Sequence, residues 1–162
     1  MGRNRMKIPT VDLIVPVCNC ADYFLEFIES LICLDRGNLR ITPIFILDGL
    51  ENEAEKDLIV NVVPNLRDIY PEVSACSLVH NMGPSRARNL GAEKTISEYL
   101  VWCDADDILT KDSLTRRVQF MEDNPEVDFG YGSYLTFRGD FKEVVKNQGP
   151  WGEPNLKPFD FM

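Results

Sequence analysis

Short apolar runs alternate with segments of helical periodicity along this chain, and that alternation restricts its possible folds more than any other feature. Runs rich in β-branched and aromatic residues predict strands at 11–17, 41–47, 73–79, 99–103 and 127–137. Between them, apolar residues recur every three or four positions, which is typical of amphipathic helices. Such strand–helix–strand units connect by right-handed crossovers and form a mainly parallel sheet. We therefore predict an α/β fold, a three-layer α/β/α sandwich.

The helices of this fold should occupy the segments between the strands. Two features mark their limits: Pro64 should kink or divide the second helix, and Thr110 should cap the last one. The predicted ranges are 21–35, 50–70, from Pro84 onward, and 111–124. The same reading gives a flexible basic arm at 1–10, one ligand-binding domain at 11–140 and a loop-like tail at 141–162.

Composition and charge exclude several classes of protein. The 162 residues are 44% hydrophobic and 27% charged, which suits one globular domain or one lobe of a larger one. A net charge of −9 argues against sequence-independent nucleic-acid binding, which depends on Lys and Arg neutralising phosphates. We find neither an apolar signal-peptide core nor a membrane span. The five scattered cysteines do not form a disulfide framework, and we expect buried free thiols in a cytoplasmic protein.

Three carboxylates follow the fourth predicted strand, at Asp104, Asp106 and Asp107. If the chain stays extended there, Asp104 and Asp106 point the same way and Asp107 the other way. Carboxylates gathered at the end of a buried strand repel each other and are costly to desolvate. A divalent cation bound to a polyanionic ligand would compensate for both effects. The alternative is a strand that leaves the core into a solvated acidic turn.

Polar residues also follow the other predicted strands, where parallel α/β folds bind ligands. Asn19, Asp48 and Asn81 occupy these positions. Asp48 could accept a hydrogen bond from a base or sugar, or serve only as a cap or turn aspartate.

The predicted helix after the third strand begins at Gly83-Pro84-Ser85, and its free N–H groups would favour an anion. Either Arg86 or Arg88 could reach that anion or the acidic cluster. The alternative for each arginine is a surface position or a structural pairing with Asp104 or Asp107.

Four segments in this order resemble one known family. They are Val15-Pro16-Val17-Cys18-Asn19, Asp48-Gly49, Asn81 to Gly91 with its Ala87-Arg88-Asn89 core, and Asp104-Ala105-Asp106-Asp107. The chain resembles the N-terminal, nucleotide-sugar-binding half of a family 2 glycosyltransferase with the GT-A fold, over roughly residues 10–137. The combination of segments is specific, although an Asp-x-Asp motif alone is weak.

The resemblance implies an enzyme that uses a UDP-, GDP- or dTDP-linked sugar with Mn²⁺ or Mg²⁺. It implies transfer to an acceptor hydroxyl with inversion; the acceptor, a glycan, lipid or protein, is not identified. A homo-oligomer or a partner subunit is a further expectation. By position, the nucleotide-sugar-binding residues are Pro16, Asn19, Asp48, Arg88 and Asp104, and the metal ligands are Asp106 and Asp104.

Departures from the family pattern concern the pocket for the nucleotide's base and the residue that would act as catalytic base. Leu47, Leu50 and Cys18 stand where the family usually has an acidic residue, a serine and an aromatic residue. The family's catalytic base lies further along the chain, so we expect it beyond Met162 and assign none here, including Glu153 and Asp160.

Two other functions stay open at this point. One is a catalytically inactive nucleotide-binding remnant or regulatory module of the same fold. The other is a sugar nucleotidyltransferase, which Pro16-Val17-Cys18-Asn19-Cys20 disfavours because it lacks a glycine-rich basic loop. Trp151 could stack on a sugar but is better explained as a packed or exposed aromatic residue.

Overall fold

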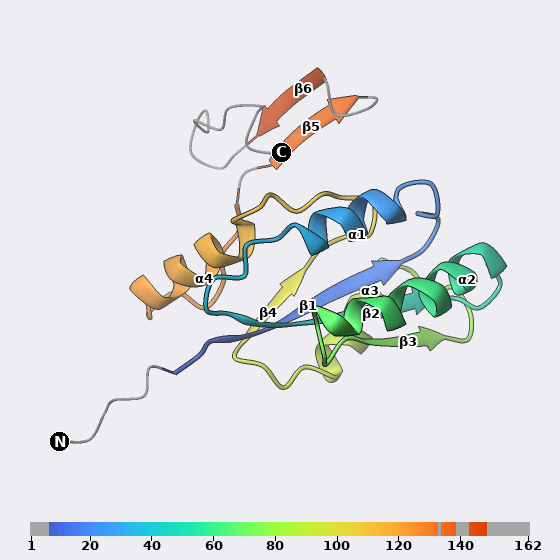
Figure 1. Ribbon diagram of the computed structural model, residues 1–162, viewed down its shortest axis with the longest axis horizontal. Coiled ribbons are helices and arrows are strands. Elements are labelled where there is room, and N and C mark those ends of the chain that lie inside the picture. Colours follow the sequence, from blue (N-terminus) through green and yellow to red (C-terminus); the bar gives the residue numbers. More distant parts are fainter. Residues whose placement is uncertain (1–6, 133, 139–142, 149–162) are drawn as a thin grey trace. The chain divides into compact units, whose positions relative to one another are not determined.

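The computed structural model describes residues 7–132, 134–138 and 143–148 (Figure 1). Most of the basic arm lies outside these residues, as do Trp151, Glu153 and Asp160. The chain divides into two compact units between Leu109 and Thr110, and each is described by itself. No helix in the described ranges is both long and apolar enough to cross a membrane.

The first unit is a four-stranded parallel sheet with the strand order β3-β2-β1-β4. Its elements follow the predicted alternation, so the α/β prediction is confirmed. They are β1 (Thr10–Val17), α1 (Phe24–Ile32), β2 (Arg40–Asp48), α2 (Glu53–Val62), η1 (Val63–Asp68), β3 (Ser74–Leu78), α3 (Pro84–Glu93) and β4 (Tyr99–Trp102).

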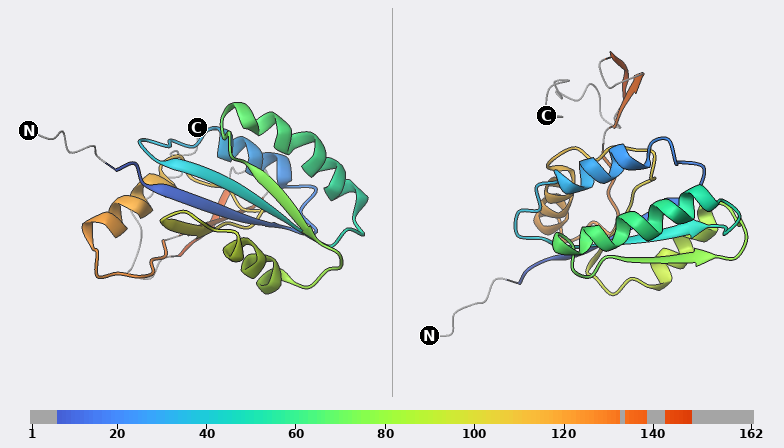
Figure 2. Two further views of the ribbon diagram at one scale, coloured as in Figure 1. Left: turned by 90° about the horizontal axis from the view of Figure 1, so that it is seen from below. Right: turned by 45° about the vertical axis from the view of Figure 1, so that its right-hand side comes forward.

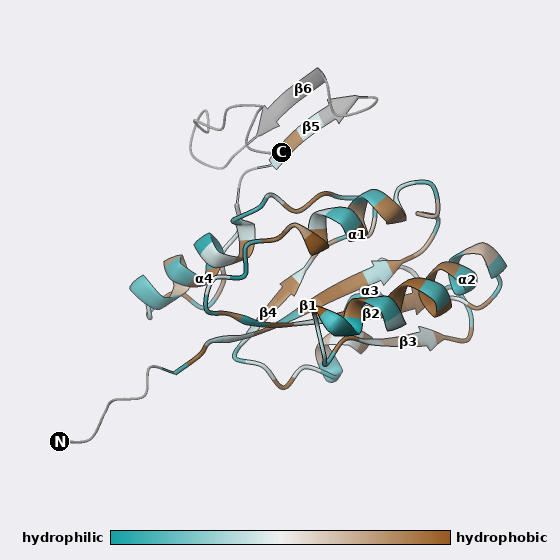
Figure 3. Cartoon of the chain, in the orientation of Figure 1, coloured by the Kyte–Doolittle hydropathy of each residue, from teal (hydrophilic) through white to brown (hydrophobic). Residues whose placement is uncertain are grey.

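Helices cover both faces of this sheet, which explains why most residues of β1 and β2 are apolar and buried. Figure 2 shows α1 and α2 on one face and α3 on the other, and Figure 3 shows hydrophobic residues along much of β1. Phe45 of β2 makes edge contacts with Phe24 and Phe27 of α1, at ring-centroid distances of 5.9 and 6.3 Å. On the opposite face, Ile14 of β1 packs in a cluster with Ala87 of α3.

Two small residues let α3 approach the sheet closely. Ala87 and Gly91 lie one turn apart on α3, and both are buried. A Cβ added to Gly91 would lie 2.3 Å from Cγ2 of Ile14, well inside any normal contact distance. The helix therefore sits where only glycine fits at position 91.

The prediction for Pro64 is confirmed, whereas the one for Cys33 is wrong. Pro64 divides the second predicted helix, because α2 ends at Val62 and η1, a 3-10 helix, begins at Val63. Cys33 is exposed rather than buried, since it follows the last buried turn of α1 as its C-cap. All five cysteines are free thiols.

The second unit contains α4 (Ser113–Asp123) and an antiparallel hairpin of β5 (Tyr134–Arg138) and β6 (Glu143–Gln148). Thr110 is not the N-cap of α4; it starts a turn closed by the Ser113 N–H, and Asp112 occupies the cap position. The strand predicted at 127–137 begins only at Tyr134. Residues 143–148, which we expected to be loop-like, form a strand because they pair with β5.

Candidate functional site

The carboxyl ends of the four parallel strands meet at one edge of the sheet, as the topology requires. Two regions at this edge carry the polar residues that the sequence analysis identified. We call residues 18–20, 48–50 and 79–83 the linked loops, because hydrogen bonds join them. We call residues 104–107 the acidic turn.

Asn81 and Asp48 connect the linked loops. The Asn81 side chain donates from Nδ2 to Cys18 Sγ at 3.1 Å and accepts at Oδ1 from the Gly83 N–H at 3.1 Å. Asp48 is only 5% exposed, and its Oδ1 accepts from the Met82 N–H at 2.7 Å. The exits of β1, β2 and β3 are therefore fixed to one another without any ligand.

The backbone contributes to the same connection at Gly49. Its neighbour Leu50 donates its N–H to the Val79 carbonyl at 3.3 Å. Gly49 has a φ of 107°, and a Cβ there would lie 2.9 Å from the Asn81 backbone nitrogen. Glycine is required both by the backbone conformation and by the close approach of the next loop.

The two residues expected at a nucleoside pocket lie at the end of β1. Pro16 is buried within the strand, so it helps form the core under the loop. Asn19 is exposed and adopts a left-handed φ of 54°, which asparagine tolerates better than most residues. The thiol next to it, Cys18, has a raised pKa because of burial and the nearby Glu55 and Asp48 carboxylates.

The sequence analysis missed Glu55. It is 2% exposed, and its Oε1 accepts from the Cys20 N–H at 2.8 Å. It lies four residues before the buried Ile59 and so on the same helix stripe. That spacing is the signal that could have identified it.

The acidic turn differs from the extended chain assumed for it. β4 ends at Trp102, and the Asp107 N–H donates to the Asp104 carbonyl at 3.1 Å, which closes a tight turn. As a result, Asp104 and Asp107 line the same pocket, whereas Asp106 is exposed and is not part of its lining. The expectation that Asp104 and Asp106 share a side, with Asp107 opposite, is wrong because alternation stops where the turn starts.

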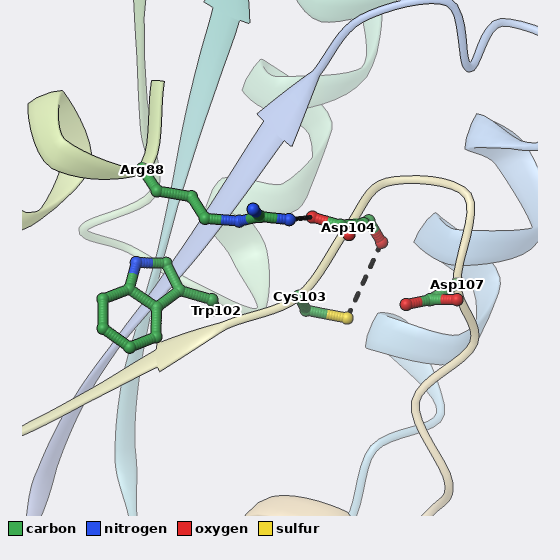
Figure 4. A pocket seen from close by; sticks show the side chains of 5 residues that line it. All are labelled: Arg88, Trp102, Cys103, Asp104 and Asp107. Carbon is green, nitrogen blue, oxygen red and sulfur yellow. Dashed lines mark hydrogen bonds and ion pairs between the residues drawn. The ribbon is translucent and has the colours of Figure 1, made fainter. Parts of the chain in front are cut away.

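This pocket is an open hollow of about 350 Å³ lined by Arg88, Trp102, Cys103, Asp104 and Asp107. Arg88 Nη2 lies 2.6 Å from Asp104 Oδ1, and Figure 4 shows the guanidinium extending from α3 to that carboxylate. Arg86 instead forms a long ion pair with Glu93, at 3.8 Å. Of the two arginines considered, Arg88 is thus the one that meets the acidic turn.

The start of α3 offers an anion fewer donors than its sequence suggests. The Gly83 N–H is already bonded to Asn81, and the N–H groups of Arg86 and Ala87 donate to the Gly83 carbonyl. Pro84 has no N–H. Of these groups, only the Ser85 N–H has no hydrogen bond described above.

Negative charge accumulates in the acidic turn. Partial burial raises the pKa of Asp107, and the neighbouring Asp106 and Asp104 carboxylates raise it further. The described residues contain no group of three His, Cys, Asp or Glu side chains able to hold a metal ion alone. Mg²⁺ and similar ions, however, usually bind through one or two carboxylates together with substrate phosphates. The oxygen donors of the turn fit a divalent cation held in that way.

Comparison with known proteins identifies the family and the fold of the chain. Residues 12–160 match the sequence profile of Glycosyl transferase family 2. An uncharacterized glycosyltransferase of Haemophilus influenzae is 32% identical over 129 residues, which cover 80% of this chain and 48% of that protein. The chain therefore spans about half the length of this relative.

Solved structures show the same fold at low sequence identity. S. aureus TarS in complex with UDP-GlcNAc has a TM-score of 0.60 and 20% identity, covering 72% of this chain and 32% of that one. The mannosyltransferase PcManGT from Pyrobaculum calidifontis, in complex with GDP-Man and Mn²⁺, has a TM-score of 0.55 and 19% identity. The aligned region covers 82% of this chain and 37% of the PcManGT chain.

Proposed function

This chain belongs to glycosyltransferase family 2, and we propose on that basis that it binds a nucleoside-diphosphate sugar at the carboxyl edge of its sheet. The donor is UDP-, GDP- or dTDP-linked. The protein transfers the sugar to an acceptor hydroxyl with inversion, through a base outside the residues assigned here.

One observation carries the proposal: the pocket after β4 brings carboxylates and a positively charged side chain together. Asp104 and Asp107 line it, and Arg88 holds one oxygen of Asp104 at 2.6 Å. That contact fixes the carboxylate's position and leaves its second oxygen for a ligand. Partial burial, and after it repulsion from Asp106 and Asp104, raises the pKa of Asp107, and a positively charged partner would offset both effects.

Asp106 and Asp104 are the side chains proposed to hold Mn²⁺ or Mg²⁺. When bound, the metal would stabilise the negative charge that develops on the leaving diphosphate. The protein's own part is to hold the turn at the end of β4 and to keep Asp104 in place through Arg88.

The nucleoside part of the donor is proposed to lie against the linked loops. Asn19 is exposed there, and Pro16 supports it from within β1. Asp48 has one oxygen bound to the Met82 N–H, so the other is available to accept from a base. The complexes of TarS with UDP-GlcNAc and of PcManGT with GDP-Man and Mn²⁺ support this class of donor.

Ligand-induced stabilisation tests the proposal. We expect UDP, GDP or dTDP to raise the unfolding temperature in the presence of Mn²⁺, with a stabilisation of about 2.7 kcal/mol at 100 times the dissociation constant. The effect should fall sharply when EDTA removes the metal. An equal shift with and without metal, or no shift with any of the three, would count against it.

Nucleotide binding without transfer is the second candidate. The observation that favours it is the lack, among the described residues, of three side chains that could hold a metal unaided. Incubation with UDP-GlcNAc or GDP-mannose and Mn²⁺ separates the candidates. Slow release of nucleoside diphosphate supports a transferase, and binding without any release supports the inactive module.

A further inference from the structure

Glu55 is a buried carboxylate to which the proposed function assigns no role. It is 2% exposed on α2, a helix whose other early residues face solvent. Among the described residues it forms no ion pair with Lys, Arg or His. Burying a charged group is costly unless hydrogen bonds or an opposite charge compensate for it. Its position therefore requires an explanation.

The Glu55 side chain forms its hydrogen bond outside its own helix. Its Oε1 accepts from the Cys20 N–H at 2.8 Å, across 35 residues of sequence. The Cys20 carbonyl in turn accepts from the N–H groups of Tyr23 and Phe24, each at 2.9 Å, at the start of α1. The carboxylate thus adjoins the positive end of α1, where a negative charge is favoured.

Asn19 stands between two anchored residues. On one side, the Cys20 N–H is held by Glu55. On the other, Cys18 Sγ is held by the Asn81 amide at 3.1 Å. Asn19 itself is exposed and has a left-handed φ of 54°. A loop residue in this conformation keeps its place only while its neighbours are restrained.

We propose that Glu55 is a positioning residue for the nucleoside: it fixes Cys20 and thereby sets the direction in which Asn19 meets the donor. The inference rests on the proposed function, in which Asn19 contacts the nucleoside. It adds a buried carboxylate from α2 to a site otherwise built from strand ends. Glu55 itself never touches the ligand.

A double-mutant cycle tests the proposal with UDP and Mn²⁺ as the probe, or with GDP if UDP does not bind. Asn19→Ala and Glu55→Met should each weaken binding about tenfold in calorimetric titration, as the loss of one hydrogen bond predicts. The double variant should be no weaker than either single variant, because both remove the same contact. Independent losses that multiply to about 100-fold would overturn the proposal.

Two further variants separate positioning from general stability. Glu55→Gln keeps a carbonyl oxygen for the Cys20 N–H, so UDP affinity should return to within about threefold of the wild type. Glu53→Met makes the same change as Glu55→Met at an exposed position two residues earlier and should leave affinity within about twofold. A loss for Glu55→Gln as large as for Glu55→Met would contradict the proposal.

The backbone amide signal of Cys20 gives a readout that needs no ligand. In Glu55→Met its NMR shift should move and its hydrogen exchange should become faster, whereas Glu55→Gln should retain slow exchange. Unchanged Cys20 and Asn19 signals in Glu55→Met would overturn the positioning role. If the wild type binds no nucleoside diphosphate but these amide effects appear, the proposed function fails while the link from Glu55 to the loop holds.

Discussion

The linked loops and the acidic turn lie at the same edge of one sheet, yet their polar side chains have different kinds of partner. In the linked loops, side chains bind backbone N–H groups, as Asp48 does with Met82 and Asn81 with Gly83. In the acidic turn, Asp104 pairs with Arg88, while Asp106 is exposed beside it. The first region is organised before a ligand arrives, whereas the second carries negative charge that a ligand can neutralise.

This difference suggests a division of work. The free energy of unfolding should depend mainly on the linked loops, and metal-dependent affinity mainly on the acidic turn. Substitutions in the two regions should therefore change different measurements, and three of them test the comparison.

Asp106→Ala should have the largest effect, and on ligand binding only. Losing a proposed metal ligand should weaken UDP binding in Mn²⁺ about 100-fold, or about 2.7 kcal/mol. Because Asp106 is exposed, the free energy of unfolding without ligand should change by less than about 0.5 kcal/mol. Calorimetric titration and urea unfolding measure the two quantities. Asp68→Ala, at an exposed aspartate in η1, is the matched control; an equal loss of affinity there would end the comparison.

Asp48→Ala, unlike Asp106→Ala, should also lower the stability of the ligand-free protein. It leaves the Met82 N–H without its carboxylate partner, so the free energy of unfolding should fall by about 2 kcal/mol. Urea unfolding without ligand measures this change. Asp48→Asn keeps an acceptor oxygen and should lose less than half as much. If Asp48→Ala were as stable as the wild type, the linked loops would not be the organised region that we describe.

Asp107→Asn should have the smallest effect, and it should depend on pH. The folded-state pKa of Asp107 is raised, so the unfolded chain loses this proton first as the pH rises from the unfolded value near 3.8. Stability from this group is therefore present at low pH and lost as the pH rises through the folded value.

The neutral amide removes that loss. At neutral pH the variant should be more stable than the wild type by about 0.5 kcal/mol or less, because water screens an exposed carboxylate. The difference should vanish at acid pH, as urea unfolding across a pH series will show. A variant less stable than the wild type at neutral pH would mean that burial and repulsion do not destabilise the charged form of Asp107.

Sequence periodicity was sufficient to predict the sheet and its helices, because each element depends on a local pattern. Pro64 ended α2 as its missing N–H requires, and the apolar runs became β1 and β2. Boundaries failed where a tertiary or turn contact decided them. Thr110 looks like a helix cap in sequence, but a turn closed by the Ser113 N–H places the helix start later.

The sequence predicted which residues lie at the candidate site better than it predicted their contacts. Asn19, Asp48, Asn81 and Asp104 all lie at the predicted edge of the sheet. Most of their partners could not be predicted, because they depend on how distant loops meet: nothing in the sequence connects Asn81 to Cys18. Residue spacing alone did not distinguish Arg88 from Arg86 as the partner of Asp104, and only the family resemblance favoured Arg88.

Gly91 affects the site without being part of it. Its missing side chain allows α3 to rest directly on Ile14, and Arg88 lies one turn earlier on the same helix. The distance between that helix and the sheet determines how far the guanidinium extends over the end of β4. The size of the residue on the buried face of α3 thus determines the position of a charged group at the surface. A single methyl group added at position 91 would disturb the packing of the core and would also displace the positive charge of Arg88 at the pocket after β4.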